Sequence, residues 1–152
     1  MIQPVLACER VTLQYIRHLR LLLSAPVCGV SEKATLAIWD CAGSERYRAP
    51  LQQLYASDPP RGAVLVYDLT DERSFADLQY WYNELLRCAP GASLLVLATH
   101  GDQPDATRVS ADDGARQAAE WGATHLTVSA KSGLNCDGIF ALMLALIKKT
   151  QA

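Results

Sequence analysis

The chain of 152 residues is poor in lysine, because only four of its 14 basic residues are lysines. They stand at Lys33, Lys131, Lys148 and Lys149. The arginines are scattered and the formal net charge is −2. Nucleic-acid binding requires a concentrated basic face, which this pattern does not offer. We therefore expect no nucleic-acid partner, and any site that needs a lysine can be checked by inspection.

Cysteine pairs and long hydrophobic runs are also lacking. The five cysteines are odd in number, widely spaced and without the short spacings of metal ligands or redox motifs. They fit free thiols in a reducing compartment. No apolar run approaches the roughly 18 residues of a membrane span, and Leu21–Leu23 is too short for a signal-peptide core of about 7–15 residues. The sequence predicts a cytoplasmic domain without a transmembrane segment.

Hydrophobic residues make up half of the chain and charged residues a fifth, which suits one domain with a sizeable core. Apolar runs that end in polar residues predict buried strands at 34–39, 62–67, 93–98 and 123–128. Apolar residues at three- and four-residue steps predict helices at 74–87, 110–121 and 135–149. This alternation predicts an α/β fold, a mostly parallel sheet with helices on both faces.

Details of two helices follow from the same pattern. Asp71 or Ser74 is expected to cap the first helix. The second helix is expected to bury three alanines, which are Ala115, Ala118 and Ala119.

The first 33 residues are less regular than the rest of the chain. Thr12–Leu23 fits a strand or a helix, and Ser24–Gly29 fits a turn. We treat the chain as a single domain, residues 1–152, in which 1–33 is the divergent part.

Polar residues gather where the predicted strands end. Asp40 closes the first strand, Thr99–Asp102 follows the third, and Ser129–Lys131 follows the fourth. In parallel sheets, ligands bind outside the carboxyl ends of the strands. A carboxylate at Asp40 can hold Mg²⁺ through water, and the backbone of Gly43 can approach a terminal phosphate. Each motif alone fits an ordinary strand-ending turn equally well.

The joint pattern is far more specific. It comprises Trp39-Asp40-x-Ala42-Gly43-x-Glu45-Arg46-Tyr47, then Val66-Tyr67-Asp68-Leu69-Thr70, then Asp102, then Val128-Ser129-Ala130-Lys131. In this order and spacing, residues 34–149 resemble the Rab branch of the Ras-like small GTPases, and 37–40 and 67–75 are most similar to the endosomal Rabs. The resemblance implies the small-GTPase form of the P-loop NTPase fold, GTP or GDP with Mg²⁺ as cofactors, and a role in vesicle-mediated protein transport.

The resemblance also implies roles for individual residues. Asp40 and Thr12 would contact Mg²⁺, and Gly43 would sense the γ-phosphate. Six residues would contact the nucleotide base, which are Thr99, His100, Asp102, Ser129, Ala130 and Lys131. Trp39, with Leu54 or Tyr55, would form the apolar surface that Rab effectors and regulators read, although Trp39 also fits a buried core position. We interpret Asp68 as scaffold.

The chain departs from the family at the phosphates. A phosphate cradle needs GxxxxGK[ST], yet the sequence contains no Gly-Lys pair. If Thr12 is the switch threonine, the first strand, the phosphate loop and the first helix are missing, and residues 1–23 must replace a central strand. Ser44 stands where the family has the glutamine that orients water, and is too short for that task. We assign no catalytic residue.

Two further departures concern the base and the membrane. Thr99-His100-Gly101-Asp102 replaces the family's Asn-Lys-x-Asp, so His100 could stack on a purine or lie free in a loop. No cysteine stands in the last five residues, so a prenylated tail is not expected, and endomembrane association would run through partners. Two hypotheses follow: a Rab-like GTP-binding protein with impaired binding and hydrolysis, or a pseudo-GTPase that binds proteins without nucleotide.

Overall fold

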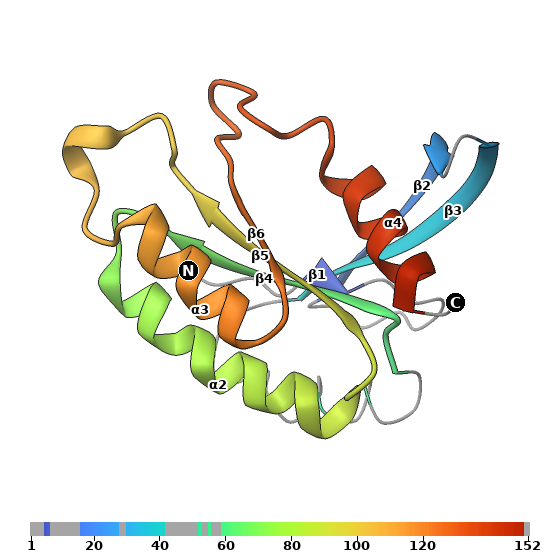
Figure 1. The fold of residues 1–152 in the computed structure, drawn as a ribbon, viewed down its shortest axis with the longest axis horizontal. Coiled ribbons are helices and arrows are strands. Elements are labelled where there is room, and N and C mark those ends of the chain that lie inside the picture. The colour runs from blue at the N-terminus through green and yellow to red at the C-terminus, as the bar shows by residue number, and fades with distance from the viewer. Residues whose placement is uncertain are drawn as a thin grey trace.

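The computed structural model describes residues 5–6, 16–27, 30–41, 52, 55 and 59–150, with side chains described from Leu36 onward. The strands are β1 (Val5–Leu6), β2 (Ile16–Val27), β3 (Val30–Cys41), β4 (Gly62–Asp68), β5 (Ser93–Thr99) and β6 (Thr124–Thr127). The helices are α2 (Glu72–Cys88), the short 3₁₀ turn η2 (Pro104–Ala106), α3 (Ala111–Glu120) and α4 (Ile139–Thr150). Figure 1 shows these elements arranged around one twisted sheet.

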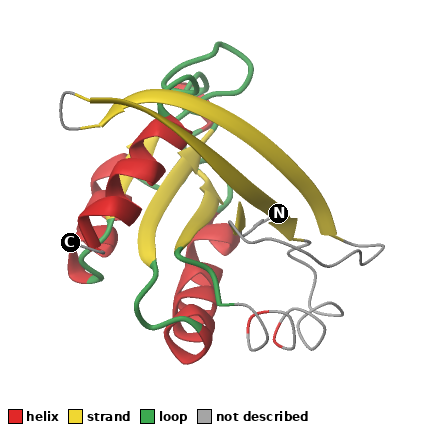
Figure 2. Cartoon of the chain, turned by 90° about the vertical axis from the view of Figure 1, so that its right-hand side faces the viewer, coloured by secondary structure: helices red, strands yellow, loops and turns green. Residues whose placement is uncertain are grey.

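The sheet has the strand order β2-β3-β1-β4-β5-β6. Strands β4, β5 and β6 pair in parallel, as the alternation of strands and helices predicts. Strands β2 and β3 instead form a long antiparallel hairpin, visible in Figure 2 as two strands lying side by side. The α/β fold is confirmed, and the parallel arrangement holds for its C-terminal strands, whereas its N-terminal strands make the sheet mixed.

Strand β1 fills the central slot between β3 and β4. Val5 lies opposite Asp40 on one side and Val64 on the other, and both pairings are antiparallel. The N-terminal segment therefore does supply a strand where the sequence requires one. A phosphate loop follows the carboxyl end of a parallel strand, whereas an antiparallel strand delivers its carboxyl end to the opposite edge of the sheet.

The hairpin resolves the strand-or-helix ambiguity in favour of a strand for residues 16–23, whereas residues 12–15 lie outside the described part of the chain. Strand β2 continues to Val27, so part of the expected turn at 24–29 is paired with β3. Pro26 lies in this strand opposite Ser31. Proline has no N–H to donate, and β2 is the edge strand of the sheet, where such a residue is tolerated.

Helices cover both faces because successive strand residues point to opposite sides. On one face, Leu65 and Val96 pack in a cluster with Leu78 and Trp81 of α2. On the other face, the alternate strand residues pack against α4. This second cluster contains Val64, Leu95, Leu97, Val128, Met143 and Ile147. Figure 1 shows α2 and α3 together on one side, away from α4.

Helix α2 begins at Glu72, two residues before the expected 74, and Asp71 is the cap of the two candidates: its carboxylate accepts a hydrogen bond from the Arg73 N–H at 3.0 Å. Helix α4 begins four residues later than the expected 135, at Ile139. Asn135 has a φ of 55°, a left-handed conformation that cannot continue a right-handed helix. Residues 135–138 therefore belong to the preceding loop.

Helix α3 packs through Gly114 and Ala118, so the predicted burial of two of its three alanines is wrong. Ala115 and Ala119 are exposed. A Cβ at Gly114 would clash with the Tyr67 hydroxyl. Only glycine lets the helix backbone approach β4 so closely, and residues 114 and 118 are one turn apart. The buried stripe therefore runs along these two residues.

Candidate functional site

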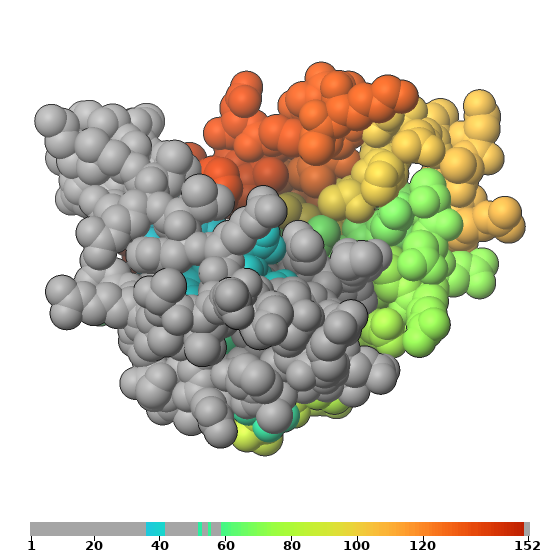
Figure 3. Space-filling model, turned by 180° about the vertical axis from the view of Figure 1, so that it is seen from behind, coloured from blue at the N-terminus to red at the C-terminus, as the bar shows by residue number. Residues whose placement is uncertain are grey.

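Six candidate residues come together after β5 and β6, at the carboxyl ends of these parallel strands. We call this the β5–β6 cluster: Thr99, His100, Asp102, Ser129, Ala130 and Lys131. Figure 3 shows the segments after β4, β5 and β6 meeting on one face of the molecule. The Gly101 N–H donates to the Val128 carbonyl at 3.0 Å and ties the two loops together. The sequence therefore predicts this grouping correctly.

The carboxylate of Asp102 is held from two sides. The buried Ser129 hydroxyl donates to Asp102 Oδ1 at 2.6 Å, and Lys131 Nζ lies 3.8 Å from Oδ2. The Ser129 hydrogen bond, aided by the charge of Lys131, holds the pKa of Asp102 below its ordinary value. Asp102 is therefore a fixed anion at neutral pH.

The conformation of the loop that carries Ser129 is fixed by hydrogen bonds within the loop and by a glycine. The Ser132 N–H donates to Ser129 Oγ at 3.1 Å, and the Gly133 N–H donates to the Ser129 carbonyl at 2.9 Å. Gly133 has a φ of 79°, which favours glycine. Lys131 lies exposed at the tip of this turn, and Ala130 beside it is exposed as well. The Ser-Ala-Lys motif thus places one buried serine and two exposed residues beside Asp102.

Thr99 and His100 make contacts with the neighbouring strand β4. The Thr99 hydroxyl donates to the Tyr67 carbonyl at 3.0 Å. His100 Nδ1 lies 2.9 Å from Asp68 Oδ1, and the imidazole is about half exposed. Sequence reasoning missed Asp68 as part of this site. The position of Asp68 could have indicated its place in the site, since it is the last residue of β4, the strand adjacent to β5.

The metal site stays a prediction. Asp40 is half-buried near the end of β3, and among the described residues no three histidine, cysteine or acidic side chains lie together as ligands. Thr12, Gly43 and Ser44 lie outside the described residues. The described side chains therefore offer one carboxylate for Mg²⁺, and one carboxylate by itself does not make a site.

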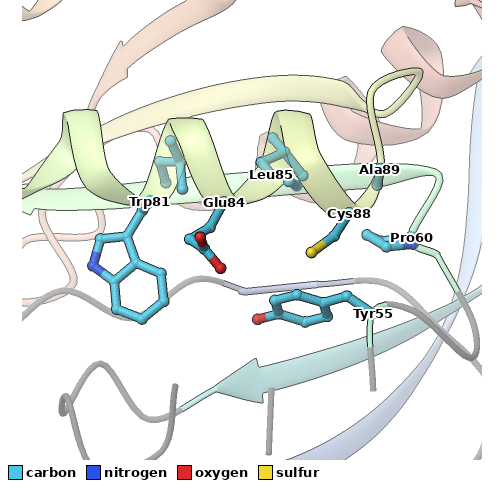
Figure 4. A pocket seen from close by; sticks show the side chains of 9 residues that line it. Tyr55, Pro60, Trp81, Glu84, Leu85, Cys88 and Ala89 are labelled. Carbon is cyan, nitrogen blue, oxygen red and sulfur yellow. The ribbon is translucent and has the colours of Figure 1, made fainter. Parts of the chain in front are cut away.

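The expected effector surface is corrected by the structure. Trp39 is 0% exposed and Tyr55 is 7% exposed, so both lie in the core, and Leu54 lies outside the described residues. Figure 4 shows Tyr55 beside Trp81 and Cys88 of α2, lining an apolar cavity of about 20 Å³. Both rings belong to the core cluster that contains Leu65 and Trp81.

Burial also makes the thiol of Cys41, next to Tyr55, unreactive. It raises the pKa of Cys41 to about 11, while the neighbouring Tyr55 hydroxyl lowers it in part. A thiol needs its thiolate form to react, so Cys41 is a core residue.

In the described part of the chain, no helix combines the length and apolar character needed to cross a membrane.

Comparisons with known proteins show the family of the chain. The model of the Ras family matches residues 23–149. The chain is 35% identical over 120 residues to the Ras-related protein Rab-26 of Rattus norvegicus, covering 77% of this chain and 45% of that protein. It is 33% identical over 118 residues to the Ras-related protein SEC4 of Saccharomyces cerevisiae, covering 78% of this chain and 54% of that protein.

A third relative is the Circularly permutated Ras protein 2 of Dictyostelium discoideum, 35% identical over 116 residues, which cover 74% of this chain and 3% of that protein. The chain spans about half the length of the two Ras-related relatives it matches. The family model nevertheless covers most of this chain, including β3 and the β5–β6 cluster. The chain therefore belongs to the Ras family, in its Rab branch.

Proposed function

We propose that the chain is a Rab-like GTP-binding domain that recognises the guanine base through its β5–β6 cluster, with weak nucleotide binding and negligible hydrolysis. The carrying observation is the fixed carboxylate of Asp102, with Oδ1 on the Ser129 hydroxyl and Oδ2 facing Lys131. A carboxylate only accepts hydrogen bonds, and guanine presents two neighbouring donors, N1–H and the 2-amino group. Adenine has no such pair.

The phosphate half of the site supports only weak binding. The residues present fit a guanine base, but the sequence offers no Gly-Lys-Ser/Thr cradle. The strand in the central slot runs antiparallel to its neighbours. Terminal phosphates gain affinity from backbone amides and a lysine at the end of a parallel strand. Mg²⁺ would contact the Asp40 carboxylate and would be bound mainly by the nucleotide itself.

The resemblance of residues 37–40 and 67–75 to the endosomal Rabs supports a cellular role in vesicle trafficking, with Rab-type effectors or regulators as partners. Such partners need an exposed surface, and Trp39 and Tyr55 do not provide one. The proposed role is tested by tagging the chain and comparing its distribution with an endosomal marker, with Asp102→Asn as the matched variant. A uniform distribution for both would contradict the trafficking role.

The biochemical proposal is tested by calorimetric titration with GDP in the presence of Mg²⁺. We expect a Kd weaker than about 1 μM, and Asp102→Asn should weaken binding at least about tenfold, or about 1.4 kcal/mol. Asp105→Asn is the matched control, because Asp105 is exposed in η2 three residues away. A phosphate-release assay with GTP should show no turnover above background.

The alternative function is a pseudo-GTPase that binds proteins without nucleotide. The observation in its favour is the lack of a Gly-Lys pair anywhere in the sequence. The same titration separates the two functions. No heat of binding at millimolar GDP, with a folded protein by circular dichroism, would overturn the first proposal and support the alternative.

A further inference from the structure

The carboxyl ends of β4 and β5 are joined by an aspartate–histidine pair that the family motifs do not assign. Asp68 Oδ1 lies 2.9 Å from His100 Nδ1. Asp68 is the last residue of β4, and His100 is the first residue after β5. A positive charge on the protonated form of His100 would also reach Asp102 and lower the pKa of that carboxyl. The imidazole therefore lies within electrostatic reach of both acids.

The carboxylate of Asp68 is itself held rigidly. Its Oδ1 accepts hydrogen bonds from the Thr70 N–H at 2.8 Å and the Thr70 hydroxyl at 2.7 Å. Burial alone would raise the pKa of Asp68, but the Thr70 hydrogen bonds and the imidazole outweigh it and hold the pKa below its ordinary value. At neutral pH, a fixed anion thus faces His100 Nδ1.

His100 needs such an anchor because its backbone is strained. Its φ is 63°, a left-handed conformation that costs a non-glycine residue about 1 kcal/mol or more. A carboxylate on Nδ1 fixes the ring plane and keeps the proton on Nδ1, so Nε2 and the ring face stay available. About half of the side chain is exposed, so a ligand can reach it.

We propose that Asp68 is a positioning residue of the base site, which acts through His100 by orienting its imidazole toward the base. This inference rests on the proposed function of the β5–β6 cluster. Lysine at this position would pack a flexible stem on the base, whereas a ring held by a carboxylate is pre-organised. Pre-organisation lowers the entropy that binding costs. Asp68 contacts no ligand itself in this arrangement.

The test is a double-mutant cycle for guanosine binding, measured by NMR titration. His100→Ala should weaken binding about tenfold, because loss of stacking on an aromatic ring typically weakens binding by this order. Asp68→Ala should weaken it about threefold to fivefold, and should add nothing in the His100→Ala background. Thr70→Val is the matched control: it removes one hydrogen bond to Asp68 and leaves the His100 pair intact, so binding should change less than twofold.

A spectroscopic readout separates positioning from simple scaffolding. In free protein, the ring ¹⁵N shifts of His100 should report a proton on Nδ1, and Asp68→Ala should move them toward the tautomer mixture of free histidine while the melting temperature stays close to that of Thr70→Val. Additive losses, or unchanged shifts in Asp68→Ala, would overturn the inference. Wild-type protein that binds no guanosine would overturn it together with the proposed function, whereas binding that His100→Ala leaves intact would overturn this inference alone.

Discussion

Two parts of the same sheet differ in what they offer a nucleotide. After β5 and β6, one buried serine, one aspartate and one lysine form a fixed arrangement at the end of parallel strands. Asp40 of β3 lies opposite Val5 of the antiparallel strand β1, and β1 pairs with β3 through two residues only. Among the described residues, the β5–β6 cluster therefore offers the side chains that the proposed base site needs, whereas β3 offers the single carboxylate of Asp40. Under the proposed function, base recognition and phosphate binding depend on separate structural elements.

The largest expected effect comes from breaking the support under the β5–β6 end. Gly114→Ala drives a methyl group into the Tyr67 hydroxyl and places it 2.8 Å from His125 Nε2. We expect the free energy of unfolding to fall by about 3 kcal/mol, because both contacts come from packed side chains. Thermal melting measures this. Gly91→Ala is the control, since nothing lies within 4 Å of the methyl group it would add, and an equal loss there would contradict the account.

A smaller loss in the free energy of unfolding is expected at β1, which pairs with β3. Leu6→Pro removes an N–H from β1, which lies between β3 and β4. Proline inside a sheet breaks a ladder hydrogen bond. Because β1 is so short, we expect a loss of about 2 kcal/mol in denaturant unfolding, below that of Gly114→Ala. A variant as stable as the wild type would show that Val5–Leu6 does not fill the central slot.

Ser129→Ala sharpens the comparison within the β5–β6 cluster. It removes the hydroxyl that donates to Asp102 and accepts from the Ser132 N–H. We expect the pKa of Asp102 to rise toward its ordinary value, with a stability loss of about 1–2 kcal/mol for the hydrogen bonds lost. NMR titration of the carboxyl carbon measures the pKa. Ser132→Ala should leave it unchanged, and an unaltered pKa in Ser129→Ala would contradict the assigned role.

The smallest effect concerns pH. Burial lowers the pKa of His125 from its ordinary 6.5, and its Nε2 lies 3.1 Å from the hydroxyl of Tyr67. Burial and Asp113 raise the pKa of Tyr67 to about 12, so that hydroxyl stays neutral. Between about pH 7 and 5 the unfolded chain binds more protons at His125 than the folded chain, so stability is lost as pH falls.

This pH dependence is measured by urea unfolding at several pH values. His125→Gln should show a shallower fall in the free energy of unfolding between about pH 7 and 5, because glutamine can replace the hydrogen bond without titrating. The same slope in both proteins would exclude His125 as the source.

Sequence periodicity predicts the C-terminal part of the fold well. The strands at 62–67 and 93–98 and the helix at 74–87 each agree with the structure to within two residues. These elements have strong apolar periods and clear boundaries. The errors lie where one residue overrides the period: Asn135 delays α4, and Gly114 draws the buried stripe of α3 away from Ala115.

The site shows the same division. Motif spacing predicts that Asp102 meets Ser129 and Lys131, because the ends of neighbouring parallel strands must converge. It does not predict that Asp68 holds His100, because that contact depends on a left-handed backbone at one residue. It leaves Trp39 open between an effector surface and a core position, and in the structure the ring is wholly buried. Whether a side chain at a strand end is buried depends on the elements that pack over it. The apolar pattern of a single strand does not show which elements those are.

We propose that this chain recognises the base through its β5–β6 cluster and holds the phosphates only weakly, because its sequence has no Gly-Lys pair. The most direct test compares the Kd values of guanosine, GMP, GDP and GTP in Mg²⁺ by one calorimetric method. We expect measurable guanosine binding and a gain in affinity of less than about tenfold, or about 1.4 kcal/mol, from guanosine to GTP. A gain of about a thousandfold or more would show a working phosphate site and contradict this proposal.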